Sequence, residues 1–300
     1  GLLTAAGNSR TPFIVNVAGL VFNVVLDPVL IFGIGPFPEL GVSGAAAATV
    51  TAQALVSLLF FKAVLREKVL FPHLRLWVLF PVKVWREIVR IGVPSAVQNL
   101  IYAGISMILT RLITGWGDLA VAAQRVGSQI ESVSWMVGDG FSAAVNAFLG
   151  QNYGAKRYDR VRRGYFCAIA MTAAWGLCTT FLLIGMARPL FSIFLQEEEV
   201  MALGVNYLRI VGLSQMFMMV EQTSIGAFSG LGRTLYPSIV SVTFTSARIP
   251  VAVLLSSVMG LSGIWWALSI SSMVKGCILF VSFVVFLYVF LERKKDEKTV

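Results

Sequence analysis

The sequence predicts an all-α protein that crosses a membrane several times, and two observations carry this prediction. Of the 300 residues, 57% are hydrophobic and only 13% are charged, whereas soluble domains carry about 25% charged residues. The hydrophobic residues form long continuous runs, and a helix of about 20 apolar residues is long enough to cross the hydrocarbon core of a bilayer. A soluble enzyme, a disordered chain and a disulfide-rich secreted domain are therefore excluded.

Eight transmembrane helices are predicted, one for each apolar run. Helices satisfy their own backbone hydrogen bonds in lipid, whereas membrane barrels use strands of about ten residues with alternating polarity. The first two runs precede a segment that is rich in basic residues, and the other six follow it. In order, the runs are Phe13–Phe32, Val42–Leu65, Ile91–Ile113, Leu119–Leu149, Tyr165–Phe194, Val205–Leu231, Ser238–Val258 and Gly263–Leu291.

The charged residues between the runs support this count, because the basic ones fall on alternate connections. One side of the membrane receives Arg10, Lys62, Arg66, Lys68, Arg75, Lys83, Arg86, Arg90, Lys156, Arg157, Arg160, Arg162, Arg163, Arg233, Arg293, Lys294, Lys295 and Lys298. The other side receives Arg188, Glu39 and the acidic run 197–199. The basic side is cytoplasmic by the positive-inside rule. We therefore expect a multi-pass protein of the cell inner (plasma) membrane with both ends of the chain in the cytoplasm, and the net charge of +9 does not indicate nucleic-acid binding.

An internal repeat predicts the domain organisation. Residues 1–12 (GLLTAAGNSRTP) resemble residues 226–237 (GAFSGLGRTLYP), and each segment precedes an apolar run that ends in a similar turn, GVSG at 41–44 and GLSG at 260–263. The copies are six runs apart, so they have the same orientation in the membrane and indicate a parallel duplication. We expect residues 1–65 to be the last two helices of an N-terminal lobe, residues 66–90 a basic cytoplasmic linker, and residues 91–300 a six-helix C-terminal lobe.

The same reasoning predicts a twelve-helix protein with two six-helix lobes, of which eight helices are visible here. The first lobe would then have about four further helices upstream. The chain begins without Met, so we interpret it as a fragment of that longer protein.

Several motifs make the chain similar to a known family. They are GNSRTP at residues 7–12, NVVLD at 23–27, LIFG at 30–33, GVSGAAAAT at 41–49, GVP at 92–94, GFSAA at 140–144 and GQNYGA at 150–155. By these motifs, which occur in the same order and spacing, the chain resembles the multidrug and toxic compound extrusion transporters. The resemblance implies two six-helix lobes around a central cavity, and export of small molecules coupled to a cation, Na⁺ or H⁺, without a cofactor.

A cation-coupling site is expected in the first lobe at Asn23, Asp27 and Thr49. Asn23 and Asp27 are one helical turn apart and so share one helix face, and Pro28 leaves the carbonyl of Val24 without its helical donor. In the family, this Asn–Asp pair belongs to a cation site that is completed by an aspartate of the first helix, which we expect upstream of this chain, and by a threonine of the sixth helix. Thr49 is the nearest match to that threonine. The alternative is a helix-packing hydrogen bond with a protonated Asp27. No metal site other than this possible Na⁺ site is expected.

A polar stripe predicts the substrate cavity, because a row of polar side chains at helical spacing does not face lipid. The stripe consists of Gln124, Ser128, Glu131, Trp135, Asp139, Ser142 and Asn146, and the first five are expected to line the cavity. Glu131 and Trp135 would suit a cationic aromatic molecule through charge and cation–π contact. The alternative is that the stripe holds helices together through hydrogen bonds.

The first helix of the second lobe adds Gln98 and Tyr102 to the expected cavity. Many members of the resembled family carry a glutamate at the position of Tyr102, on the helix that follows the GVP motif. This departure favours coupling through Asp27. For Tyr102 itself, packing inside the helix bundle is the alternative.

Three further charged residues lie deep in predicted helices. Arg248 occupies in the second copy of the repeat the place that Asn23 occupies in the first. We expect it to form a buried ion pair with Glu221, the nearest acidic residue on the preceding helix, and contact with the substrate is the alternative. Lys275 should also face the interior, but the sequence does not indicate which acidic residue would pair with it.

Together these observations predict a secondary active multidrug efflux transporter, an antiporter and not an enzyme. It would exchange organic cations or amphiphiles for Na⁺ or H⁺ by alternating access. We expect a monomer that contacts membrane lipid and a small-molecule substrate. The alternative is a flippase for lipid-linked saccharides on the same scaffold, which would need Arg125, Arg248 and Lys275 to face the cavity instead of forming ion pairs. A membrane-embedded enzyme is a third reading with little support, because no paired acidic motif lies on a loop.

Overall fold

The structure is a computed structural model that describes residues 2–5, 7–66 and 82–291. The chain divides into two compact units, Gly1–Phe80 and Pro81–Val300. Within the described residues every regular element is a helix, so the predicted all-α class is confirmed.

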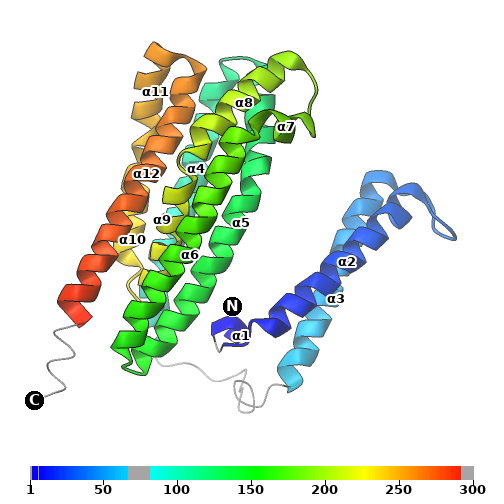
Figure 1. The fold of residues 1–300 in the computed structure, drawn as a ribbon. Coiled ribbons are helices and arrows are strands. Elements are labelled where there is room, and N and C mark those ends of the chain that lie inside the picture. Colours follow the sequence, from blue (N-terminus) through cyan, green and yellow to red (C-terminus); the bar gives the residue numbers. More distant parts are fainter. Residues whose placement is uncertain (1, 6, 67–81, 292–300) are drawn as a thin grey trace, which may run out of the picture. The chain divides into compact units, whose positions relative to one another are not determined.

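The first unit is a pair of long helices. The short helix α1 (Leu2–Ala5) precedes α2 (Arg10–Phe32), which packs along α3 (Gly41–Arg66) (Figure 1). Glycines allow this close packing: a Cβ atom on Gly19 would strike Val56, and one on Gly44 would strike the carbonyl oxygen of Leu30. The interface therefore depends on small residues, as is common between membrane helices.

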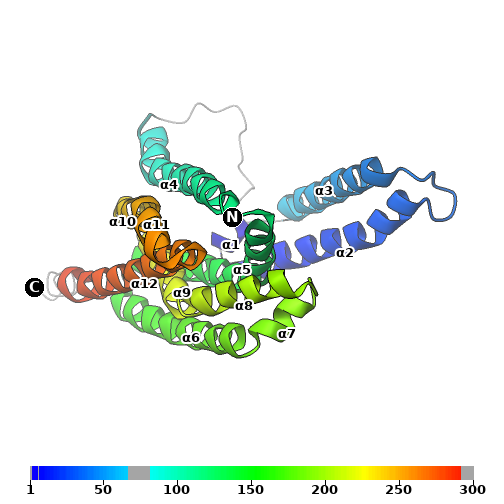
Figure 2. The ribbon, with the colours of Figure 1, turned by 90° about the horizontal axis from the view of Figure 1, so that it is seen from above.

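The second unit is a helix bundle. Its elements are α4 (Val82–Thr114), α5 (Asp118–Gly154), α6 (Tyr158–Gly185), α7 (Ala187–Ser192), α8 (Glu198–Gly212), α9 (Gln215–Gly230), α10 (Leu235–Ser246), α11 (Arg248–Met259), α12 (Leu261–Phe286) and a π-helical turn, η1 (Leu287–Leu291). Helix α9 packs against α5, α6 and α12, whereas α4 packs mainly against α10 (Figure 2). The long axis of the bundle runs along α5, α6 and α12 (Figure 1).

Three predicted segments differ from the observed helices in detail. The segment 165–194 is divided into α6 and α7, and the segment 205–231 belongs to a bent pair, because α8 and α9 meet at 50°. At this bend the Ser214 hydroxyl donates to the carbonyl oxygen of Val211 at 2.8 Å, and such side-chain bonds compete with the regular helical pattern. The segment 238–258 is interrupted at Ala247, since Pro250 has no N–H to donate to Ser246.

The start of α4 also differs from the expectation. Helix α4 begins at Val82, inside the predicted basic linker 66–90, instead of at Ile91. Residues 67–81 of that linker lie outside the described residues.

The described residues contain six helices that are long and apolar enough to cross a membrane, or seven if the bent pair α8–α9 is one span. The six are Arg10–Phe32, Gly41–Leu65, Val82–Thr114, Tyr158–Gly185, Leu235–Met259 and Leu261–Val289. Helix α5, which carries the predicted polar stripe, is not among them. The count of eight spans therefore stays a prediction.

The internal repeat is visible in the backbone. Before α2 and before α10, the chain turns at a glycine with positive φ, 90° at Gly7 and 70° at Gly232. Equivalent hydrogen bonds close both turns, all at 2.9 Å. In the first turn, Gly7 N donates to Thr4 O and Asn8 N donates to Leu3 O. In the second turn, Gly232 N donates to Ser229 O and Arg233 N donates to Phe228 O. Because donors and acceptors correspond when Gly7 is aligned with Gly232, the two segments have the same local geometry as well as similar sequences.

The second half of the repeat shows the same correspondence. A Cβ atom on Gly44 would strike the backbone of Leu30, and one on Gly263 would strike the backbone of Leu255. Leu30 and Leu255 are also equivalent when the two copies are aligned so that Gly7 is paired with Gly232. The last glycine of each turn thus contacts the helix that precedes it, which supports the duplication inferred from the sequence.

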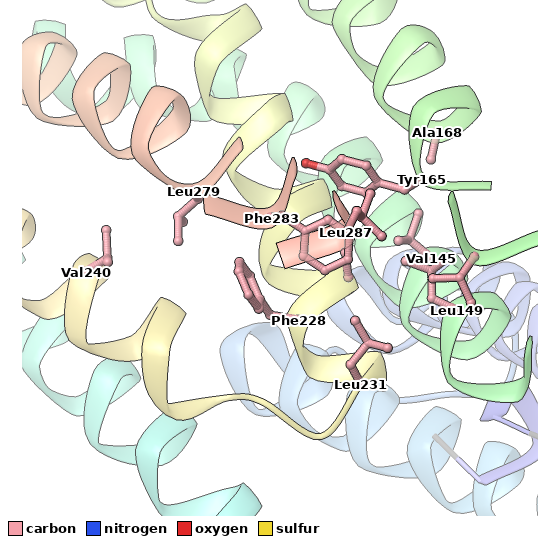
Figure 3. Packing of buried hydrophobic residues seen from close by; sticks show 12 residues of the cluster. Val145, Leu149, Tyr165, Ala168, Phe228, Leu231, Val240, Leu279, Phe283 and Leu287 are labelled. Carbon is pink, nitrogen blue, oxygen red and sulfur yellow. The ribbon is translucent and has the colours of Figure 1, made fainter. Parts of the chain in front are cut away.

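A cluster of aromatic residues forms one core of the second unit. The ring of Phe283 lies 4.3 Å from that of Tyr165 and 4.9 Å from that of Phe228 (Figure 3). The Tyr165 hydroxyl shares a hydrogen bond of 2.9 Å with Ser224. These contacts join α6, α9 and α12 and so fix the position of α9, which contributes to the cavities described next.

Candidate functional site

Two adjoining cavities lie inside the second unit, with volumes of about 310 Å³ and 360 Å³. Their walls come from α4, α5, α9, α10, α11 and α12, and α8 contributes to the first cavity. The two cavities share Tyr102, Trp135, Met218, Thr245, Arg248 and Ser272. Both volumes fall at the lower end of the range, roughly 300–1,000 Å³, that is typical of small-molecule sites.

The structure brings all seven predicted cavity residues to these walls. Gln124, Ser128 and Glu131 line the first cavity, Gln98 and Asp139 line the second, and Tyr102 and Trp135 line both. The spacing of the stripe on α5 explains this result, because residues three or four apart project from one helix face.

Glu131 is held by three hydrogen-bond donors. Its Oε1 accepts from Trp135 Nε1 at 3.0 Å and from Gln215 Nε2 at 2.9 Å, and its Oε2 accepts from the Tyr207 hydroxyl at 3.0 Å. Tyr207 lies on α8 and Gln215 on α9, so one carboxyl group of α5 binds both arms of the bent pair. Glu131 is only 6% exposed, and its oxygens are directed mainly at groups of the protein.

Aromatic side chains form part of the wall between the cavities. The rings of Tyr102 and Trp135 meet edge to face with centroids 6.4 Å apart, a favourable arrangement for aromatic pairs. The predicted cation–π role of Trp135 is not tested by this geometry, although its indole N–H is already donated to Glu131.

The buried ion pair joins different residues from those predicted. Lys275 Nζ lies 2.7 Å from Glu221 Oε1, and the two side chains are 6% and 8% exposed. The predicted pairing of Glu221 with Arg248 is therefore wrong, because α9 packs along α12, which carries Lys275. Arg248 instead donates from Nε to Ser271 at 3.1 Å and from Nη2 to Ser272 at 3.0 Å.

Two arginines line the cavities without a salt bridge to a carboxylate. Arg248 is 7% exposed and lines both cavities, and Arg125 lines the first one. Within the described residues, neither forms a salt bridge with a carboxylate. Arg248 also interacts with the hydroxyl group of Tyr102. Arg125 is exposed, whereas Arg248 is buried, and the Glu131 carboxylate attracts Arg248 without a salt bridge between them.

The first unit brings together two of the three predicted cation-coupling residues. Asn23 Nδ2 donates to Asp27 Oδ1 at 3.4 Å, and both residues are half-buried on α2. Thr49 is exposed, and its hydroxyl donates to the carbonyl oxygen of Ala45 one turn earlier on α3. Among the described residues, no hydrogen bond links Thr49 with the pair.

Sequence reasoning missed Tyr207 and Gln215 as partners of Glu131. Both are ordinary residues of apolar stretches, and the break between α8 and α9 changes the direction of the helix between them. Their spacing of eight residues is compatible with one helix face, but nothing in the sequence indicates that this face meets α5. The serines that bind Arg248 carried no signal, since serine is common in membrane helices.

Comparison with known proteins identifies the family. The MatE family model matches residues 94–254 of the chain. This chain belongs to the MatE family. The resemblance to the multidrug and toxic compound extrusion transporters is thereby confirmed.

Relatives in the MatE family have two kinds of names. The chain is 31% identical over 278 residues to the probable multidrug resistance protein NorM of Thermotoga maritima, which covers 88% of this chain and 57% of that protein. It is 26% identical over 280 residues to the FAD transporter of Shewanella oneidensis, covering 91% of this chain and 61% of that protein. The chain thus spans a little over half the length of these curated relatives.

Solved MatE structures share the fold. A mutant of the Vibrio cholerae MATE transporter VcmN aligns with a TM-score of 0.81 at 22% identity, over 96% of this chain and 65% of that one. A MOP superfamily transporter from Pyrococcus furiosus aligns with a TM-score of 0.85 at 20% identity, over 95% of this chain and 64% of that one. Both comparisons confirm the helical membrane-transporter fold.

Proposed function

We propose that the protein is a secondary active transporter that exports small amphiphilic molecules in exchange for Na⁺ or H⁺. The observation that carries this proposal is the pair of cavities inside a bundle of apolar helices, lined by charged, polar and aromatic side chains. Ionisable groups at this depth are costly in a membrane and mark the pathways of substrates and ions. Alternating access would expose the cavities to each side of the membrane in turn.

Asn23 and Asp27 are the proposed coupling site. A carboxylate and an amide in contact on one helix turn offer oxygen ligands to Na⁺ or a site for a proton, and Pro28 adds the unbonded carbonyl of Val24. Thr49 would complete this site only if its hydroxyl left the carbonyl oxygen of Ala45. Its part in the proposal rests on the family resemblance.

The proposed location is the cell inner membrane, with the basic turns in the cytoplasm. The turn between α5 and α6 and the turn between α9 and α10 lie at the same end of the second unit, since a Cβ atom on Gly150 would contact the Gly230 carbonyl oxygen at 2.9 Å. Lys156, Arg157 and Arg233 occur in these turns, which supports a cytoplasmic location for that end. We further propose that the protein acts as a monomer surrounded by lipid and does not bind nucleic acid.

The names of the relatives point to more than one class of substrate. The two relatives are named as a multidrug resistance protein and as an FAD transporter, so an organic cation is only one candidate. The second candidate function, a flippase for lipid-linked saccharides, is favoured by one observation, namely that Arg125 and Arg248 line the first cavity without forming salt bridges among the described residues. Lys275 counts against it, because its charge is paired with Glu221.

Export by cells that express the full-length protein tests the proposal. Cells are loaded with a cationic, a neutral or an anionic fluorescent amphiphile, and efflux is followed with and without an inward Na⁺ or proton gradient. We expect gradient-dependent efflux by the native protein and its loss in Asp27→Asn. Glu39→Gln is the matched control, because Glu39 is an exposed acid of the same unit and its removal should leave efflux unchanged.

Two outcomes would contradict the proposal in different ways. Normal gradient-dependent efflux by Asp27→Asn would make Asp27 structural and place coupling elsewhere. The lack of any efflux by the native protein, at normal expression and with an intact fold, would exclude the exporter and favour the flippase.

A further inference from the structure

We propose that Arg248, together with Arg125, binds an anionic group of the transported molecule, so that the substrates are anions or zwitterions. This inference rests on the proposed function and names the substrate class for the same cavities. It departs from the organic cation that the sequence led us to expect.

Arg248 is a buried charge that the protein leaves incompletely compensated. Its guanidinium binds two neutral serine hydroxyls, Ser271 and Ser272, and interacts with the hydroxyl of Tyr102. An arginine side chain carries more N–H donors than these and stays charged in proteins. Arg248 is only 7% exposed and forms no salt bridge within the described residues, and Glu131 attracts it only from beyond contact distance. A buried charge of this kind is costly, and an anion that enters the cavity would lower that cost.

The carboxylates around the cavities do not form a salt bridge with Arg248 among the described residues. Glu221 is bound to Lys275 at 2.7 Å, and Glu131 accepts hydrogen bonds from three neutral donors. Asp139 lines the second cavity, as Arg248 does, but forms no salt bridge with it among the described residues. In the first cavity, two arginines face the single carboxyl group of Glu131, which forms a salt bridge with neither.

The geometry of the site suits an anion attached to a flat apolar body. A guanidinium presents parallel N–H groups that match the oxygens of a phosphate or carboxylate. Arg248 lines both cavities, as do Tyr102 and Trp135. A molecule with its anionic group at Arg248 would therefore place an attached ring beside these two aromatic side chains, where stacking is favourable.

Inorganic phosphate is the simplest probe of this site. The full-length protein is purified in lipid nanodiscs, and its thermal unfolding is followed by intrinsic fluorescence in phosphate and in chloride of equal ionic strength. A ligand that binds the folded protein raises the unfolding midpoint. We expect a phosphate-specific upward shift in the native protein, a reduced shift in Arg125→Gln and no shift in Arg248→Gln. Arg160→Gln is the control, because Arg160 is exposed on α6 and outside both cavities, and it should retain the full shift.

A pair of flavins extends the test to a substrate-sized probe. Flavin mononucleotide and riboflavin share their ring system and differ by one phosphate group. We expect the native protein to bind the mononucleotide at least about tenfold more tightly, since charge-assisted hydrogen bonds contribute that much. Arg248→Lys should keep part of this preference, because lysine retains the charge and loses the fork of donors.

The native protein alone can overturn the inference, even if Arg248→Gln does not fold. Equal unfolding midpoints in phosphate and chloride would exclude an anion site. A phosphate shift that persists in folded Arg248→Gln would place the anion elsewhere and would equally exclude the assignment. Export of cationic or neutral amphiphiles without a phosphate effect would refute this inference and leave the proposed function intact. A phosphate effect that depends on Arg248, without export of any dye, would support the anion site and refute the proposed function.

Discussion

The buried ion pair between Lys275 and Glu221 gives the sharpest prediction for stability. Substituting Lys275→Met or Glu221→Gln removes one charge and leaves the other buried without a counter-ion. The side chains are 6% and 8% exposed and their charged atoms are 2.7 Å apart. Breaking such a pair from one side costs about 3–5 kcal/mol, whereas replacing both partners by neutral groups is often close to neutral.

An exposed ion pair of the same protein is the matched control. Arg188 and Glu198 are 2.8 Å apart, nearly the same distance, but their side chains are 66% and 73% exposed. Water screens such a pair, so its removal should change the free energy of unfolding by at most about 1 kcal/mol. The two pairs therefore differ in burial and not in distance.

A double-mutant cycle measures the difference. Both single variants and the double variant of each pair are unfolded by denaturant in lipid nanodiscs, and the free energies of unfolding are compared. For Lys275 and Glu221 we expect two costly single substitutions and a double variant that recovers most of the loss. The reasoning would be refuted if each single substitution cost less than about 1 kcal/mol, or if the double variant lost the sum of both.

Two further predictions concern packing and the bent pair, and thermal unfolding checks both. Gly263→Ala should destabilise the protein by about 1–3 kcal/mol, because its new Cβ atom would strike the backbone of Leu255. Gly140→Ala is the control, because no atom lies within 4 Å of its new Cβ. This substitution should be neutral or should stabilise the protein by up to about 1 kcal/mol. Equal effects at both glycines would contradict this account. Glu131→Ala should cost about 2–6 kcal/mol, since it leaves the buried Tyr207 hydroxyl and Gln215 amide without their acceptor, at about 1–3 kcal/mol each. A loss below about 1 kcal/mol would show that other groups or water satisfy these donors.

The sequence was sufficient to predict the helical class and the interior face of α5. Lipid excludes rows of polar side chains, so the spacing of Gln124, Glu131 and Asp139 identified the face that lines the cavities. The internal repeat could also be read from the sequence, because glycine is the residue that tolerates the positive φ found at Gly7 and Gly232.

The pairing of charges inside the bundle could not be predicted in this way. A helical period gives the face of each helix but not which helix it meets, and the residue nearest in the chain, Arg248, was therefore taken as the partner of Glu221. In the structure α9 packs along α12, which brings Lys275 to Glu221. The break after Gly212 adds a second difficulty, since it changes the direction of α9 at the point where the register would have to be extrapolated.

The composition of α5 has a consequence for how the protein is made. This helix carries Arg125, Glu131 and Asp139, and a charged residue at the centre of a span opposes insertion by about 2.5–3.5 kcal/mol. Its most extensive packing is with α9, and the donors that satisfy Glu131 belong to α8 and α9, which leave the ribosome later. If α5 spans the membrane as the sequence predicts, we expect it to remain beside the insertion machinery, or beside α4 and α6, until α8 and α9 are made, and to enter the bilayer together with them.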